Sequence, residues 1–158
     1  MRKISIAGLS VLFVLFTACK SGDKKSDDKL SADALKAKAD SLYTAVIDEH
    51  DAGMVGWMKI EGRQTQINSL LDSIAKLPAK AQSSLADLKA KLNDANTALS
   101  NAYKEMDVWM QEMNLDSAAN DLETRLRYLS DEKLKGSKIT EMINSSVQKA
   151  DSLLKVKF

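Results

Sequence analysis

Cysteine, proline and histidine each occur once in this chain of 158 residues, and aromatic residues make up only 5% of it. A single cysteine excludes a disulfide within the chain, so packed side chains have to hold the fold together. One proline and six glycines leave long stretches without residues that break helices. The sequence is rich in Ala, Leu, Lys, Asp and Ser, and this composition is typical of an all-α protein.

An excess of basic charge is also lacking. The chain has 23 Lys and Arg residues against 22 Asp and Glu residues, and removal of residues 1–18 would take away Arg2 and Lys3 but no acid. A nearly neutral chain has no basic face dense enough to replace the counterions of a phosphate backbone. We therefore expect no nucleic-acid partner.

The residue sets of common enzyme classes are missing as well. The one histidine, His50, is accompanied by no catalytic serine motif, which argues against a nucleophilic triad. Zinc needs several His or Cys ligands, and the Glu-x-x-His motif of di-iron bundles is absent because Glu49 directly precedes His50. No glycine-rich phosphate loop is present either. These absences predict that the protein is not an enzyme.

Residues 1–18 have the three parts of a signal peptide. Met1–Lys3 is basic, Ile4–Phe16 is an apolar run that is too short for a membrane span of about 20 residues, and the small residues Thr17 and Ala18 precede the expected cut. The residues 16–19, Phe-Thr-Ala-Cys, resemble the lipobox of bacterial lipoproteins, in which diacylglycerol alkylates the cysteine. We expect lipid on Cys19; the alternatives are an ordinary signal peptide with a chance cysteine, or an uncleaved anchor.

Residues 19–30 follow as the lipidated cysteine and a polar, charged tether without an apolar residue before Leu30. Several acyl chains are enough for stable anchoring, so membrane attachment needs no other feature. We expect the protein outside the cytoplasm, in the cell envelope, with the outer membrane as its anchoring membrane.

From Ser31 onward the apolar residues follow a three-then-four spacing, which predicts helices that pack as in a coiled coil. The pattern predicts helices over 31–76, 79–113 and 117–155. Ser31 is a suitable N-cap of the first, and Pro78 separates the first from the second. Asp116 or Ser117 is the expected cap of the third.

Short connections make successive helices antiparallel, so we expect an up-down-up three-helix bundle over residues 31–158, about 50 to 65 Å long at 1.5 Å per residue. A coiled-coil oligomer is the alternative, and a homodimer remains open. The predicted seam of the third helix is weak at Lys133 and Thr140 and contains Gly136. With turns near 78 and 116, Gly136 is expected near Ala95 and residues 57–61, where it would make room for Trp57 in the core.

The motif Met-x-x-Trp-Met occurs twice, at residues 54–58 and 106–110, and supplies the core residues Trp57 and Trp109. The predicted fold-back puts His50 opposite Met106, and Val46 opposite Met110, with Met54 one turn from His50. Thioether and imidazole ligands suit Cu(I), and an indole face adds a cation-π contact. The candidate metal ligands are therefore His50, Met54, Met106 and Met110; methionine and tryptophan that simply fill the core are the alternative.

Several segments resemble a family of small helical lipoproteins of the Bacteroidota that are often mislabelled as viral A-type inclusion proteins. These segments are His50-Asp51 with Met54 and Ile60, the run from Asn101 to Met110, and Tyr128-Leu129 with the charged helix to Leu154. The resemblance spans about residues 35–155, with Val55-Gly56-Trp57 in place of the commoner Met-Pro-Lys. The resemblance implies the helical fold and the location as a lipoprotein, and it implies no activity.

We therefore expect a membrane-anchored envelope lipoprotein that acts as a non-enzymatic interaction or structural module, with an envelope protein as its partner and no cofactor. The alternative is a helical bundle that binds or senses Cu(I) or Ag(I) through its His, Met and Trp cluster. A chaperone-like helical protein is a third hypothesis and would require an exposed apolar face.

Overall fold

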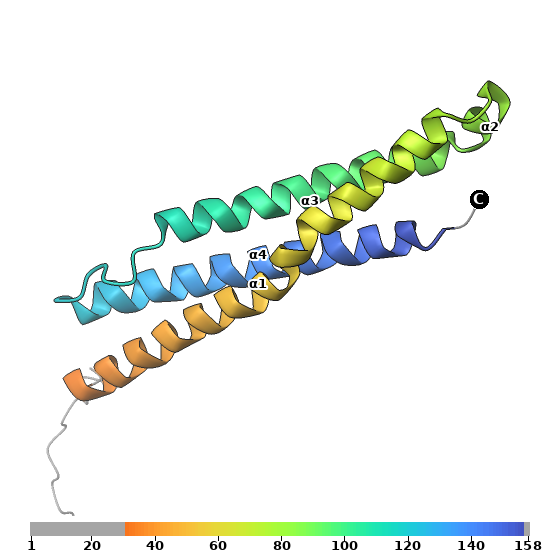
Figure 1. Ribbon diagram of the computed structural model, residues 1–158. Helices are drawn as coiled ribbons and strands as arrows, with labels where there is room; N and C mark the ends of the chain where they lie inside the picture. The colour runs from red at the N-terminus through yellow and green to blue at the C-terminus, as the bar shows by residue number, and fades with distance from the viewer. Residues whose placement is uncertain (1–30, 157–158) are drawn as a thin grey trace, which may run out of the picture.

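The computed structural model describes residues 31–156, and within them the regular structure is entirely helical, which confirms the predicted all-α fold. The helices are α1 (Ala32–Ala75), α2 (Ala79–Ser84), α3 (Ala86–Glu112) and α4 (Leu122–Leu154). Figure 1 shows α1, α3 and α4 lying along one another, with α3 running opposite to the other two and α2 at the end remote from the start of α1. The predicted signal peptide, Cys19 and the tether lie outside the described residues.

Helix α1 begins and ends close to the predicted residues. The Oγ of Ser31 accepts a hydrogen bond from the backbone N–H of Ala34 at 3.2 Å, as expected of an N-cap. The helix ends at Ala75, shortly before Pro78. The side-chain amide of Gln82 donates to the carbonyls of Ala75 and Leu77, so α2 satisfies the last carbonyl of α1 and one in the turn that follows.

The predicted helix over 79–113 is divided into α2 and α3. Leu85 separates them, with φ −103° and ψ 9°, and its N–H bonds to the carbonyls of both Ala81 and Gln82. No proline or glycine marks this break, and the apolar periodicity of the sequence continues across it. The sequence therefore predicts one helix where the structure has two. The connection between the two long helices α1 and α3 is therefore longer than a turn at Pro78 alone.

Helix α4 begins at Leu122, and the predicted start at 117 is wrong. Its N-cap is Asp121, whose carboxylate accepts hydrogen bonds from the backbone N–H and the hydroxyl of Thr124. These bonds, the hydroxyl first, hold the pKa of Asp121 below its usual value. The guanidinium of Arg125 donates to the carbonyls of Leu115 and Ser117 and so holds residues 113–121 in a folded connection instead of a helical turn.

Most buried positions of the three long helices recur every seven residues, which is the coiled-coil repeat that the sequence predicts. In α1 the series is Ala39, Val46, Gly53, Ile60, Ile67 and Ile74; in α3 the two series are Leu92, Leu99, Met106 and Ala95, Ala102, Trp109; in α4 they are Leu129, Gly136, Ile143, Ala150 and Glu132, Ile139, Ser146. The core therefore runs along the whole length of the helices.

The predicted seam of α4 is wrong at two positions. Glu132 and Ile139 are buried, whereas Lys133 is exposed and Thr140 is only half-buried. The predicted seam and the observed seam share Leu129, Gly136 and Ile143. They differ in the second seven-residue series that faces the core. The Thr140 hydroxyl donates to the Glu49 carbonyl at 2.9 Å, so it serves the contact between α4 and α1.

Glycines allow α1, α3 and α4 to approach closely. A Cβ at Gly53 would lie 2.4 Å from the Met106 Cε, and a Cβ at Gly56 would lie 2.6 Å from the Ile143 Cγ2. A Cβ at Gly136 would lie 2.6 Å from the Trp109 Cη2, so Gly136 makes room for Trp109 and the predicted partner, Trp57, is wrong. Residues 113–121 make the connection before α4 longer than predicted, which accounts for the position of Gly136 beside Trp109.

Candidate functional site

A buried carboxylate lies at the contact between α3 and α4. Trp109 and Glu132 are each only 4% exposed, and the indole Nε1 donates to the Glu132 Oε2 at 2.7 Å. The Lys135 Nζ donates to the other oxygen, Oε1, at 2.8 Å. A buried charge is costly unless it is paired and hydrogen-bonded, and here both oxygens have a donor.

Lys135 connects this buried carboxylate to the surface. Its side chain is 60% exposed although its ammonium group reaches the buried Glu132. The hydrogen bond to Glu132 raises the pKa of Lys135 above its ordinary value, and Glu112 adds a smaller attraction. The lysine therefore remains a fixed positive charge at the mouth of the α3–α4 contact.

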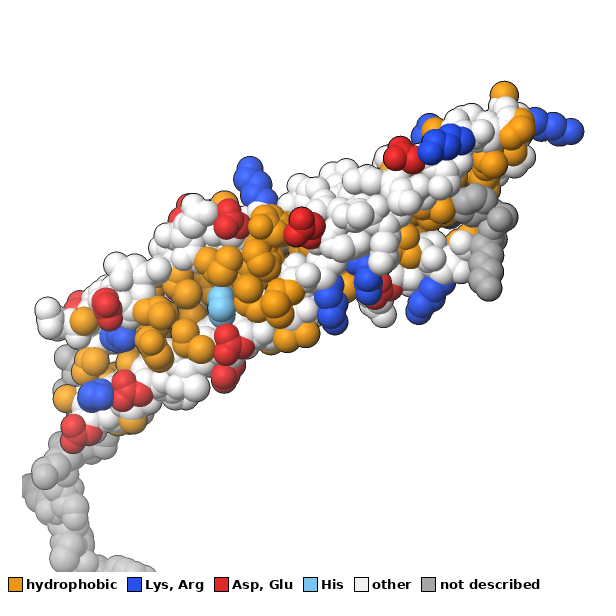
Figure 2. Space-filling model, viewed as in Figure 1, with side chains coloured by type: hydrophobic (Ala, Val, Ile, Leu, Met, Phe, Trp, Pro, Cys, Tyr) orange, Lys and Arg blue, Asp and Glu red, His pale blue; other side chains and the backbone are white. Residues whose placement is uncertain are grey.

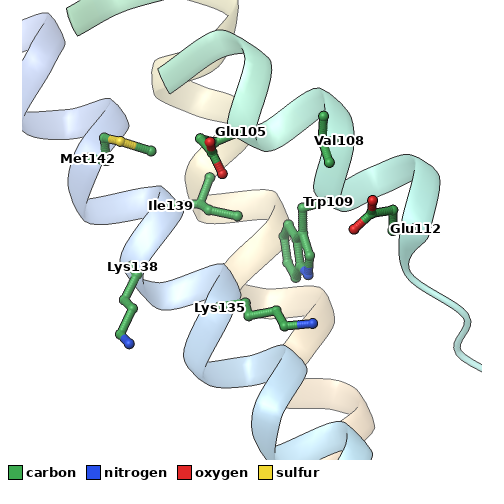
Figure 3. Close-up of a pocket in the computed structure, with 8 residues that line it drawn as sticks. All are labelled: Glu105, Val108, Trp109, Glu112, Lys135, Lys138, Ile139 and Met142. Atoms are coloured by element: carbon green, nitrogen blue, oxygen red, sulfur yellow. The ribbon is translucent and has the colours of Figure 1, made fainter. Parts of the chain in front are cut away.

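An open hollow of ≈ 340 Å³ lies in this contact, and we call it the α3–α4 groove (Figure 3). Its apolar part is formed by Val108 and Trp109 from α3 and by Ile139 and Met142 from α4. Its charged lining residues are Glu105, Glu112, Lys135 and Lys138.

The charges of the α3–α4 groove are separated by sign. Both acids, Glu105 and Glu112, belong to α3 and are seven residues apart, so they lie on one face of that helix. Both cations, Lys135 and Lys138, belong to α4. In the described part of the chain, no ion pair involves Glu105, Glu112 or Lys138. The groove thus has an acidic side, an apolar centre and a basic side.

A second feature lies between α1 and α3, on the face shown in Figure 2, where hydrophobic side chains flank the one imidazole and acidic side chains lie directly below it. Trp57 stacks on Tyr103 with ring centroids 4.5 Å apart and donates from Nε1 to the Tyr103 carbonyl at 3.3 Å. Trp57 is half-buried against the core, in contrast to the fully packed Trp109. The ring of His50 lies 6.4 Å from that of Trp109.

The predicted pairing of α1 with α3 is wrong by about one helical turn. Trp109, not Met106, lies beside His50, and Met106 reaches Gly53. The longer connection through α2 explains the shift. Met106 is fully buried, whereas His50, Met54 and Met110 are half-buried. Across residues 31–156, no group of three His, Cys, Asp or Glu side chains is placed to hold a metal ion.

Glu132 is the residue that the sequence pattern does not reveal. A charged residue next to Lys133 in a helical stretch is usually solvated. Glu132, Ile139 and Ser146 are spaced seven residues apart, and this spacing was the one signal of burial in the sequence. The signal was weak because only one of the three residues is apolar. The hydrogen bond from Trp109 explains how a carboxylate occupies this core position.

Comparisons with known proteins give no relative: no family model, no curated protein and no solved structure matches the chain. None of the helices in the described part of the chain has both the length and the apolar character needed to cross a membrane.

Proposed function

We propose that this chain is a non-enzymatic, lipid-anchored protein of the bacterial cell envelope whose α3–α4 groove binds an amphipathic helix of another envelope protein. In this proposal α1, α3 and α4 act as an up-down-up three-helix bundle, with α2 as part of a connection. Cys19 carries the lipid and anchors the chain in the outer membrane. The resemblance to helical lipoproteins of the Bacteroidota supports the same location.

The observation that carries the proposal is the arrangement of charge around the apolar centre of the groove. An entering helix would place an apolar side chain against Val108 and Met142. Basic residues on one flank of that helix would meet Glu105 and Glu112, and acidic residues on the other flank would meet Lys138. Flanking charges of this kind set the orientation and the partner of packed helices.

A photo-crosslinking experiment tests the groove in cells that produce the full-length chain. p-Benzoylphenylalanine at position 108 is expected to crosslink to one envelope protein, within a helical segment that has a basic and an acidic flank. The matched control is the same residue at position 134, because Leu134 is 55% exposed on α4 and does not line the groove.

Charge reversal makes the experiment specific. Glu105 and Glu112 are exposed, so the double variant Glu105→Lys and Glu112→Lys should keep its helicity. It is expected to lower crosslinking from position 108 by about tenfold, and acidic residues introduced into the basic flank of the partner should restore it. Equal crosslinking from positions 108 and 134, or crosslinking to a second copy of this chain, would overturn the proposed partner.

The anchor is tested by Cys19→Ser. Without the thiol that accepts diacylglycerol, the variant is expected to accumulate as an uncleaved precursor that incorporates no radiolabelled palmitate. The measurement is the mass and the label of the chain in membrane fractions, with the wild-type chain as the positive control. A variant that is still labelled and cleaved like the wild type would refute lipidation at this residue.

A further inference from the structure

The contacts between α1 and α3 fix which residues face each other across these antiparallel helices. Trp57 stacks on Tyr103, and Gly53 lies against Met106. In antiparallel helices, moving one turn back along one helix corresponds to moving one turn forward along the other. His50 is therefore level with Trp109, as the 6.4 Å ring separation shows, and with the adjacent Met110.

The same register places three methionines within about one helical turn of the level of His50. Met54 lies one turn from His50 on α1, and Met106 lies one turn from Met110 on α3. Met106 reaches Gly53 of α1, the residue directly before Met54, so His50 and Met110 lie at one level of the two helices and Met54 and Met106 lie at the next. We call these four residues the His–Met cluster.

One nitrogen of the His50 imidazole is engaged by a neighbouring carboxylate. Its Nδ1 lies 2.9 Å from the Asp51 Oδ1, and since an ionised carboxylate only accepts hydrogen bonds, Nδ1 carries a proton. The lone pair of a neutral imidazole is then on Nε2. A carboxylate that accepts from one nitrogen while the other binds a metal is the usual arrangement around metal-binding histidines.

We infer that the His–Met cluster is a binding site for a soft monovalent cation, Cu(I) or Ag(I), held by the Nε2 of His50 and the thioether sulfurs of Met54, Met106 and Met110. Soft ligands of this kind select Cu(I) over the harder divalent ions. The site is separate from the α3–α4 groove and does not depend on the proposed partner.

Titration of the full-length chain in detergent with Ag(I) tests the inference, because this ion is not oxidised in air. With methionine labelled in its methyl carbon, one equivalent of Ag(I) is expected to shift the signals of Met54, Met106 and Met110. Met58 is 68% exposed and Met142 lines the α3–α4 groove, so these two signals serve as internal controls and should not shift. The fluorescence of Trp109 should fall with the same one-to-one stoichiometry.

Variants distinguish the cluster from other silver-binding groups. Met110→Leu and His50→Ala are each expected to weaken binding by at least about tenfold, while Met58→Leu should leave it unchanged. The Met→Leu changes conserve volume, so the fold is retained. Silver bound to a free Cys19 thiol would be insensitive to both cluster variants, and that result, or the absence of methyl shifts at micromolar Ag(I), would overturn the inference.

Discussion

Trp109→Asp is expected to unfold the helices of this protein. The substitution removes a large aromatic side chain from a position that is 4% exposed, and such a loss costs about 3–5 kcal/mol. It also deprives Glu132 of its indole donor and puts a second carboxylate beside it. Burial of two like charges adds several kcal/mol, and the sum approaches the whole stability of a typical domain, about 5–15 kcal/mol.

Far-ultraviolet circular dichroism and thermal melting measure this effect. Lys104→Asp is the matched control, because Lys104 is exposed on the same helix, and its melting temperature should stay close to that of the wild type. If Trp109→Asp kept the helicity and melting temperature of the control, the placement of Trp109 and Glu132 in the core would be wrong.

The seven-residue spacing predicted much of the core from the sequence, because packed helices impose that period on their buried side chains. Ser31 as the first cap and the end of α1 near Pro78 were also predictable, since each depends on the chemistry of one local residue. The lengths of the connections between helices could not be predicted. The break at Leu85 is marked by neither proline nor glycine, and the connection over residues 113–121 is held by hydrogen bonds from Arg125 that have no local sequence signature.

The errors in the candidate sites follow from those connection lengths. The α3–α4 connection is longer than predicted, so Gly136 contacts Trp109 instead of Trp57. The α1–α3 connection is also longer than predicted, so His50 lies beside Trp109 instead of Met106. The sequence identified residues of the candidate sites, but it did not identify which residue each of them contacts. Glu132 was missed for another reason: charge disfavours burial, and only its contacts with Trp109 and Lys135 in the folded state offset that preference.

Gly136→Ala and Gly62→Ala are expected to have opposite effects on stability. Alanine is favoured over glycine by about 1 kcal/mol in a helix, and a Cβ at Gly62 would meet no atom within 4 Å, so Gly62→Ala should raise stability by about 0.5–1 kcal/mol. A Cβ at Gly136 would lie 2.6 Å and 2.9 Å from two atoms of the Trp109 ring. Overpacking of this kind costs about 1–3 kcal/mol.

The rigid indole makes the substitution at position 136 destabilising. Its Nε1 is held by Glu132, so the ring cannot turn aside without losing a buried hydrogen bond, and the overpacking cost should lie near its upper limit. We expect Gly136→Ala to lower the free energy of unfolding by about 2 kcal/mol, after the gain in helix propensity is included. Urea denaturation of the two variants and the wild type measures the difference.

A second background isolates the contact between the two side chains. Phenylalanine at position 109 lacks the outer indole atoms, Cζ2 and Cη2, that a Cβ at position 136 would meet. In the Trp109→Phe chain, Gly136→Ala should therefore cost little or stabilise, as Gly62→Ala does. The difference between the two backgrounds is the coupling energy of the pair, expected at about 2–3 kcal/mol. An equal loss in both backgrounds would mean that α4 requires glycine at this position for a reason other than the indole.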